Sequence, residues 1–149
     1  MLSEEIRSDV EVLWQYHNMR HTLHPCDTGI GLGSHDLGVA IVATDLFQHG
    51  IAIGSVLLMS RPYQQRRAFA TCKKLWPEVD VICYSRPLSL DDHVASIGDT
   101  GKVVAMLVGD TQRIEVYAER GSAIAQEMPD DVRAAFRRLV AAAYVSRLL

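Results

Sequence analysis

Two short apolar runs, separated by a helix-length segment, restrict the fold of this chain more than any other feature. The runs are IGSVLLM at 53–59 and VDVICYS at 79–85, and both are mostly apolar without strict alternation. Strands of a parallel sheet have this composition because helices cover the sheet's faces. The segment at 63–75 has an apolar side and ends before Pro77, as expected of a crossover helix between parallel strands. The pattern therefore predicts an α/β domain.

The remaining segments extend this pattern in both directions. Ser3 and the acidic residues after it predict the start of a helix over 3–23 that ends before Pro25. Further elements are expected as a strand at 27–33, a helix at 34–50, a helix at 101–119 and a last helix that begins at Pro129. The expected fold is a Rossmann-like three-layer domain with a parallel sheet of about three strands and additional N- and C-terminal helices.

Composition limits the classes of protein to which the chain can belong. Its 149 residues suit one domain, and 48% apolar with 22% charged residues is the balance of an ordinary globular protein. A net charge of −3 argues against nucleic acid as a partner. No run reaches the roughly 20 apolar residues that span a bilayer, so no membrane association is expected. The three cysteines show no paired spacing, which favours a cytoplasmic location.

Two strand-to-helix turns are candidates for a ligand site. In parallel α/β sheets, ligands bind beyond the carboxyl ends of the strands, beside helix N-termini. The first turn contains Gly33, Ser34 and Asp36, whose backbone N–H groups could approach a ligand. It does not complete a dinucleotide fingerprint, and a tight structural turn is the alternative.

The second turn carries several positive charges beside a predicted helix start. Ser60 could cap that helix, while Arg61, Arg66 and Arg67 add charge where the helix end is already positive. An anion would relieve this repulsion by accepting hydrogen bonds from the guanidinium groups. Tyr63 could stack on the ligand. Alternatively, the arginines pair with acids of the protein or reach solvent.

Other patterns carry less functional information. His17, His21 and His24 lie at helical spacing, but no acidic ligand accompanies them, and we expect no metal. Asp110 and Arg113 are spaced for an ion pair on a helix surface. The run at 34–36 contains the residue types of a hydrolytic triad, yet neighbours in sequence rarely reach triad geometry. A sheet of three strands has exposed edges, so a homodimer formed by edge pairing is a further expectation.

Three blocks of the sequence resemble the YdcF-like family, which includes the SanA and ElyC envelope proteins. They are 13–50, 55–85 and the tail formed by VGDTQRIEVYAERG at 108–121 and MPDDVRAAFRRLVAAAYVSRLL at 128–149. The resemblance implies a Rossmann-like sheet with an LG-S-x-D turn after its first strand, and an arginine-bearing turn after a later one. At least one such protein binds S-adenosylmethionine, and no reaction is established for the family as a whole.

The chain departs from this family pattern near 50–55. A Ser-Gly-Gly turn and an Asn-Thr-x-Glu-Asn motif normally separate the first two blocks, and here 45–50 leads almost directly into the strand at 53–59. About two strand–helix units, roughly sixty residues at ~30 each, are therefore expected to be absent. Because crossovers are right-handed, the directly joined strand should enter the vacated slot, or the helix before it should cover the other face.

Together these observations predict a single YdcF-like domain over 1–149 that binds a small anionic or nucleotide-like molecule such as S-adenosylmethionine. The sequence singles out no catalytic acid or base for this reading, and Asp36, near the glycine turn, is the candidate if the chain is an enzyme. Two alternatives remain open at this point. One is an enzyme that acts on a phosphorylated envelope precursor, and the other is a shortened, non-catalytic paralogue that binds no ligand.

Overall fold

The computed structural model describes residues 2–32 and 53–149 of the chain. Within these ranges, three strands form one parallel sheet in the order β1-β2-β3, with β1 at Thr28–Gly31, β2 at Ser55–Met59 and β3 at Asp80–Tyr84. The described helices are α1 (Glu4–His17), the 3-10 helix η1 (Pro62–Gln64), α3 (Gln65–Leu75), α4 (Leu90–Ile97), α5 (Thr100–Glu119) and α6 (Asp130–Ala141). The predicted α/β Rossmann-like class, with its small parallel sheet, is confirmed.

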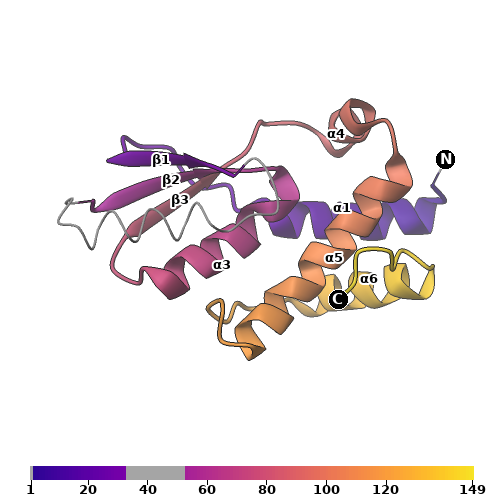
Figure 1. Cartoon of the computed structure of the whole chain (residues 1–149). Coiled ribbons are helices and arrows are strands. Elements are labelled where there is room, and N and C mark those ends of the chain that lie inside the picture. The colour runs from indigo at the N-terminus through magenta and orange to yellow at the C-terminus, as the bar shows by residue number, and fades with distance from the viewer. Residues whose placement is uncertain (1, 33–52) are drawn as a thin grey trace.

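Helix α3 connects β2 to β3 and packs against one face of the sheet (Figure 1). Val56 and Leu58 of β2 are buried, whereas Met59 is 43% exposed, because successive side chains of a strand point to opposite faces. The buried strand residues meet Ala68 and Cys72 of α3 in one apolar cluster. The amphipathic pattern over 63–75 thus places this helix as predicted.

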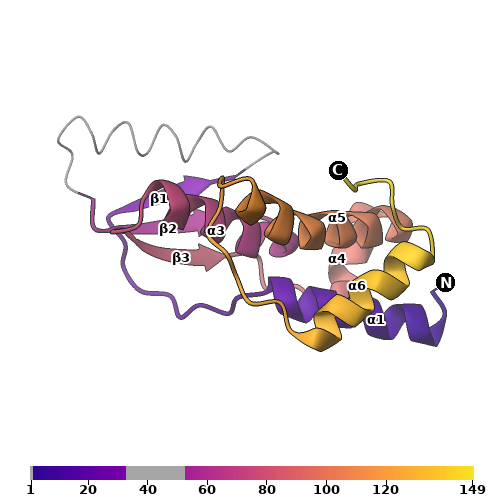
Figure 2. The same cartoon turned by 90° about the horizontal axis from the view of Figure 1, so that it is seen from below.

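The other helices form a second apolar core beyond the carboxyl ends of the strands. Helices α1, α5 and α6 pack together there, with α4 beside α5 (Figures 1 and 2). Leu13, Leu107 and Leu139, one from each of the three packed helices, have no exposed surface. Arg138 of α6 also forms a bidentate ion pair with the buried carboxylate of Asp9, at 2.6–3.1 Å. The sheet therefore ends against a helical wall, and this positions the site described below.

Helix α1 is shorter than predicted, because it ends at His17 rather than near residue 23. Its start is as expected, since Ser3 Oγ accepts a hydrogen bond from the N–H of Ile6. After Asn18 the chain runs along the outer edge of β3 before it enters β1 (Figure 2). There His21 Nδ1 accepts a 2.9 Å hydrogen bond from the N–H of Cys83. This contact with β3 takes the place of a further turn of α1. It also occupies the N–H of Cys83, which is therefore unavailable for pairing with a second copy, and the edge-paired homodimer stays a prediction.

Helix α4 (Leu90–Ile97) lies between the run at 79–85 and the helix at 101–119, where the sequence predicted no helix. Ser89 caps its start by accepting from the N–H of Asp92, and Gly98 ends it with φ of 76°. The helix has only eight residues, too few to be stable alone. Burial of Leu90 against the second core stabilises it.

Some expectations lie outside the described residues. These are the helix at 34–50 and the connection from β1 to β2, so the hand of that crossover is not described. Within 2–32 and 53–149, no helix is both long and apolar enough to cross a membrane.

Gly109 is required by the close approach of the C-terminal segment to α5. A Cβ at this position would lie 2.6 Å from the carbonyl oxygen of Arg147. Alanine normally stabilises a helix interior by up to about 1 kcal/mol relative to glycine. Here we expect Gly109→Ala to destabilise the protein and to release residues 145–149 from α5, as measured by hydrogen exchange of that segment.

Gly101 provides the matched control on the same helix. A Cβ there would meet only Asp99 Oδ1, at 3.6 Å, which is an ordinary contact. Gly101→Ala should leave exchange of 145–149 unchanged and should not lower stability. Equal exchange in both variants would contradict the packing constraint at Gly109.

Candidate functional site

A cleft of about 600 Å³ lies where all three strands end. Its walls come from the residues at the carboxyl end of each strand and just beyond, namely Gly31, Leu32, Met59, Ser60, Arg61, Tyr84, Ser85, Arg86 and Pro87. This is the edge at which parallel α/β sheets bind ligands, because loops and helix starts converge there.

The same tripeptide, Ser-Arg-Pro, follows both β2 and β3. It occupies residues 60–62 after β2 and residues 85–87 after β3. The pairing of Met59 with Tyr84 continues past the strands, since the N–H of Ser60 donates to the Tyr84 carbonyl at 3.1 Å. Extending this register by two residues puts Arg61 beside Arg86.

Proline explains why the two arginines emerge in parallel. A residue that precedes proline is held in extended backbone, and Arg61 has φ of −67° and ψ of 150°. Proline then ends the ladder because it has no N–H to donate. Side chains two positions apart on an extended strand share a face. The side chain of Arg61 is therefore expected on the same face of the sheet as that of Met59. The side chain of Arg86 is expected on this face as well, beside that of Tyr84.

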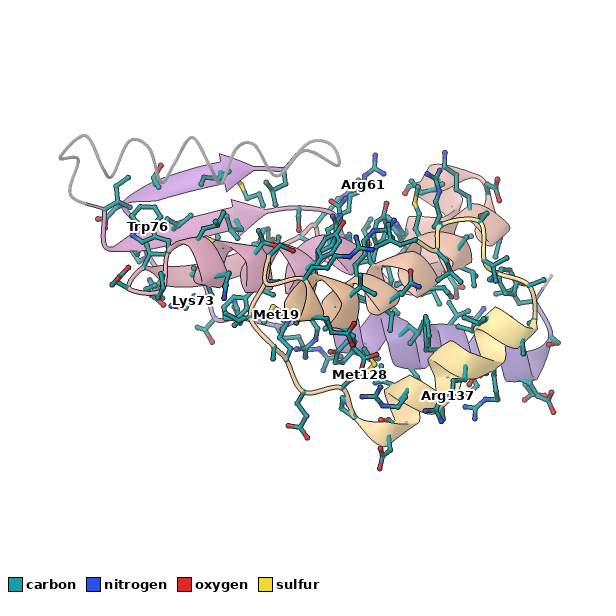
Figure 3. The ribbon with its side chains drawn as sticks, turned by 60° about the horizontal axis from the view of Figure 1, so that its bottom comes forward. Met19, Arg61, Lys73, Trp76, Met128 and Arg137 are labelled. Atoms are coloured by element: carbon teal, nitrogen blue, oxygen red, sulfur yellow. The ribbon has the colours of Figure 1, made fainter. Side chains whose placement is uncertain are left out.

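The guanidinium of Arg61 is held by a hydrogen bond to a buried tyrosine, Tyr63. Its Nη1 donates to the hydroxyl oxygen of Tyr63 at 2.9 Å, and that hydroxyl donates in turn to Met106 Sδ at 3.1 Å. Tyr63 is only 1% exposed, so it orients the guanidinium and does not reach the cleft surface. Figure 3 shows Arg61 at the end of the sheet that faces the helices. The sequence predicted that Tyr63 stacks on a ligand, and burial of its ring in the core corrects that expectation.

The second tripeptide is held by Gln65 at the start of α3. The side-chain amide of Gln65 donates to Ser85 Oγ at 2.8 Å, and its oxygen accepts from the N–H of Met19 at 3.0 Å. Gln65 and Ser85 are both buried. One side chain thus connects the end of β3 to the segment that follows α1, and it fixes the backbone from which Arg86 projects.

The cleft combines these two cations with exposed apolar surface. Met59 and Tyr84 remain 43% and 36% exposed. Among the residues that the structure describes, neither Arg61 nor Arg86 has a carboxylate partner, and the described lining contains no aspartate or glutamate. Burial and then the positive charge of Arg61 lower the pKa of nearby His93, which favours its neutral form. The cleft therefore presents a positive site beside an apolar surface.

Arg66 does not belong to this cleft. Its Nε donates to the backbone carbonyl of Tyr16, and its guanidinium carbon lies 4.1 Å from the centre of the Tyr16 ring. Its Nη1 also lies 3.5 Å from Gln126 Oε1. Carbonyls in the last turn of a helix have no hydrogen-bond donor within the helix. Arg66 provides the donor for the carbonyl of Tyr16 at the end of α1. Its contacts join the crossover helix α3 to the second core.

Arg67 is buried in an ion pair with Asp110 of α5. Its Nε lies 3.0 Å from Asp110 Oδ1, and both side chains are only 8% exposed. The N–H of Arg67 Nε does not point at the carboxylate oxygen, so the contact is an ion pair without a hydrogen bond from this nitrogen. Asp110 therefore pairs with α3, whereas the sequence analysis expected a surface pair with Arg113. The positive cluster of the second turn is thus divided among three different environments.

The remaining candidates are placed as follows. Ser60 lines the cleft, but it caps no helix, because its hydroxyl donates to the carbonyl of Arg61 at 3.1 Å. Gly33, Ser34 and Asp36 lie outside the described residues. The three histidines contact different partners: His17 contacts Thr111, His21 contacts Cys83, and His24 contacts Asp80. No group of three potential metal ligands occurs in the described ranges.

Arg86 is the charged cleft residue that was not predicted from the sequence, and Met59 and Tyr84 of the lining were not predicted either. Its signal was present, because SRP occurs twice and each copy follows a predicted strand. The second copy is less conspicuous, because no arginine-rich segment follows it. Recognising the pair also requires the register of β2 against β3, which follows from tertiary pairing.

Comparison with known proteins places the chain in a family. A protein of Streptomyces coelicolor, described as "Uncharacterized protein SCO4629", is 32% identical over 214 aligned positions, which include all of this chain and 97% of the relative. The chain belongs to the family of this protein. No family model matches the sequence, and no solved structure matches it.

The same alignment shows a difference in length. It has 214 positions and the chain has 149 residues, so at least 65 positions have no residue of this chain opposite them. The relative therefore contains substantial sequence that this chain lacks.

The contact between Arg61 and Tyr63 leads to a prediction. Tyr63→Phe keeps the ring in the core but removes the hydroxyl, so we expect the free energy of unfolding to fall by about 1 kcal/mol. Arg61 should become more mobile, which NMR of its side-chain N–H groups would detect. The control is Tyr84→Phe, because Tyr84 is partly exposed and its change should leave both measurements unaltered. An unchanged Arg61 signal in Tyr63→Phe would contradict the anchoring role.

Proposed function

We propose that this protein binds a small anionic or nucleotide-like molecule in the cleft at the carboxyl end of its sheet. One observation carries the proposal: Arg61 and Arg86, each two residues past the paired Met59 and Tyr84, both line a cleft whose described lining holds no acid. Guanidinium groups bind carboxylates and phosphates through paired hydrogen bonds. S-adenosylmethionine, which the YdcF-like resemblance suggests, remains a candidate because it has a carboxylate and an aromatic ring system.

The chemistry of the described lining supports binding more than catalysis. It contains no histidine, cysteine, lysine or carboxylate, so its hydroxyl groups, on Ser60, Tyr84 and Ser85, have no base in the described lining to activate them. Asp36, the predicted catalytic candidate, lies outside the described residues. For the enzyme alternative, Asp36→Asn should abolish turnover of a phosphorylated substrate while binding persists.

The length difference favours a second candidate function. At least 65 positions of the Streptomyces alignment are unmatched, which supports a shortened paralogue that has lost its ligand and serves as an interaction module. This alternative predicts that no small molecule stabilises the protein. The two candidates are thus separated by one measurement.

The experiment is a thermal-shift screen with S-adenosylmethionine, nucleotides and simple carboxylates. Binding at 100 times Kd adds about 2.7 kcal/mol to stability, which raises Tm by roughly 5–10 °C in a protein of this size. We expect a shift that Arg61→Gln abolishes. The control is Arg137→Gln on α6, which makes the same charge change at an exposed residue away from the cleft (Figure 3). The absence of any shift that depends on Arg61 would overturn the proposal in favour of the shortened paralogue.

A further inference from the structure

We propose that the two Ser-Arg-Pro tripeptides form a clamp for a phosphate group, so that the cleft takes a phosphate ester with a flat ring. The inference rests on the proposed anion-binding function and narrows it to one chemical class. Its basis is the juxtaposition of Arg61 and Arg86, with Met59 and Tyr84 on the same face.

The spacing of the strands brings the two guanidinium groups to one ligand. Neighbouring strands lie about 4.8 Å apart. The register of β2 with β3 ends at Met59 and Tyr84, and extending it by two residues places the arginines side by side. Each arginine precedes a proline and is therefore held in extended backbone. Both line the cleft. A single group of atoms between them can accept hydrogen bonds from both.

Charge favours a phosphate over a carboxylate. Two exposed guanidinium groups side by side repel each other, and the described lining offers no acid to compensate either. A carboxylate carries one negative charge and is satisfied by one arginine. A phosphate monoester carries close to two at neutral pH and has three terminal oxygens, which matches two guanidinium groups. S-adenosylmethionine has one carboxylate and two positive groups, and so it suits the pair less well.

The rest of the ligand is indicated by the residues two positions before each arginine. Met59 and Tyr84 pair directly in the sheet and remain partly exposed beside the arginines. Thioether and aromatic side chains provide a surface on which a flat ring can pack. A phosphate ester with its ring over Met59 and Tyr84 would fill both parts of the cleft. A nucleoside monophosphate has this form.

The clamp is oriented before any ligand arrives. Tyr63 holds Arg61 through its hydroxyl, and Gln65 holds the backbone before Arg86 through Ser85. Tyr63, Gln65 and Ser85 are all buried, so their positions are set by the packed interior. Such preorganisation reduces the entropy that binding costs. Tyr63 and Gln65 are therefore positioning residues of the site.

Calorimetric titration with matched ligands tests the inference. The probes are adenosine 5′-monophosphate, adenosine 5′-carboxylate, adenosine and inorganic phosphate, each with the full chain. We expect the monophosphate to bind at least about tenfold more tightly than the carboxylate, and adenosine to bind weakest. Arg61→Gln and Arg86→Gln should each weaken monophosphate binding by about tenfold or more, and Arg137→Gln should change it less than twofold. Arg61→Lys keeps the charge and should recover only part of the loss.

Two results would overturn the clamp in different ways. Equal affinity for monophosphate and carboxylate, with dependence on Arg61 alone, would remove the phosphate clamp while leaving the anion-binding function in place. If neither the nucleotides nor inorganic phosphate bind in a way that depends on Arg61 and Arg86, the clamp is refuted. If S-adenosylmethionine and simple carboxylates also fail, the proposed function falls with it. Unfolding midpoints of the variants, which change exposed residues, separate loss of binding from loss of folding.

Discussion

Replacing Asp110 by asparagine should lower the free energy of unfolding by about 3–5 kcal/mol. The change leaves the guanidinium of Arg67, 8% exposed and 3.0 Å from the altered side chain, without its counter-charge. An uncompensated charge in the interior is costly because it has lost its water and gained no partner. A domain of this kind has about 5–15 kcal/mol of total stability, so the loss would be evident in urea unfolding at pH 7.

A double variant separates the cost of a broken pair from the value of the pair itself. Arg67→Met with Asp110→Leu replaces both charges by apolar groups of similar size, and such replacements are often neutral or stabilising. We expect it to recover most of the stability lost in the single variant. Asp91→Asn is the exposed control, since it breaks the surface contact of Asp91 with Arg7 and should change stability little. Equal losses in the single and double variants would show that packing, not charge, dominates at this position.

Acidification from pH 7 to pH 5 should cost the protein about 2 kcal/mol through His17 alone. His17 is fully buried, and its Nε2 lies 2.9 Å from Thr111 Oγ1. Burial, and then the positive charges of Arg66 and Arg67, lower its pKa from 6.5 to about 3. Below pH 6.5 the unfolded chain therefore binds a proton that the folded protein does not. Stability is fully present above pH 6.5 and falls as the pH decreases toward 3.

Urea unfolding at pH 7 and pH 5, with His17→Gln as the variant, measures this contribution. Glutamine can still donate to Thr111 but does not titrate, so the dependence on pH should be smaller by about 2 kcal/mol than in the natural protein. The pKa values of His21 and His93 are also lowered, mainly by burial, and the residual dependence in the variant is assigned to them. Carboxylates with lowered pKa, such as Asp27, lose their contribution only at more acid pH. An identical pH dependence in both proteins would show that His17 is charged in the folded state.

Local patterns predicted most elements of the fold. Apolar runs and amphipathic spacing located β2, α3 and β3 to within two residues, because both signals arise from the burial of one face. Ser3 and Pro129 marked helix starts for a similarly local reason, since a cap depends on only a few neighbouring groups. The errors came where distant contacts decide. His21 binds the edge of β3 and so lies beyond the end of α1, and α4 is stabilised by packing against α5.

The candidate site was predicted less completely than the fold. Of the predicted turn after β2, Ser60 and Arg61 both line the cleft, and their binding of a ligand stays a prediction. Three residues that were predicted to share one ligand site have different environments: Arg66 contacts the end of α1, Arg67 pairs with Asp110, and Tyr63 lies in the core. A helix separates adjacent residues by about 100° around its axis, so neighbours in sequence face different elements.

By itself, the sequence determined that this chain forms a parallel α/β sheet with a positively charged turn at its carboxyl edge. Hydrophobic periodicity and helix capping depend on residues close together in the chain, so both can be recognised from the sequence. Only the tertiary structure decided which charges remain available to a ligand. The pairing of β2 with β3 brings Arg61 beside Arg86, twenty-five positions later in the chain, while packing of the helices occupies Arg66 and Arg67. Electrostatic partners are chosen by distance in space, and folding sets those distances.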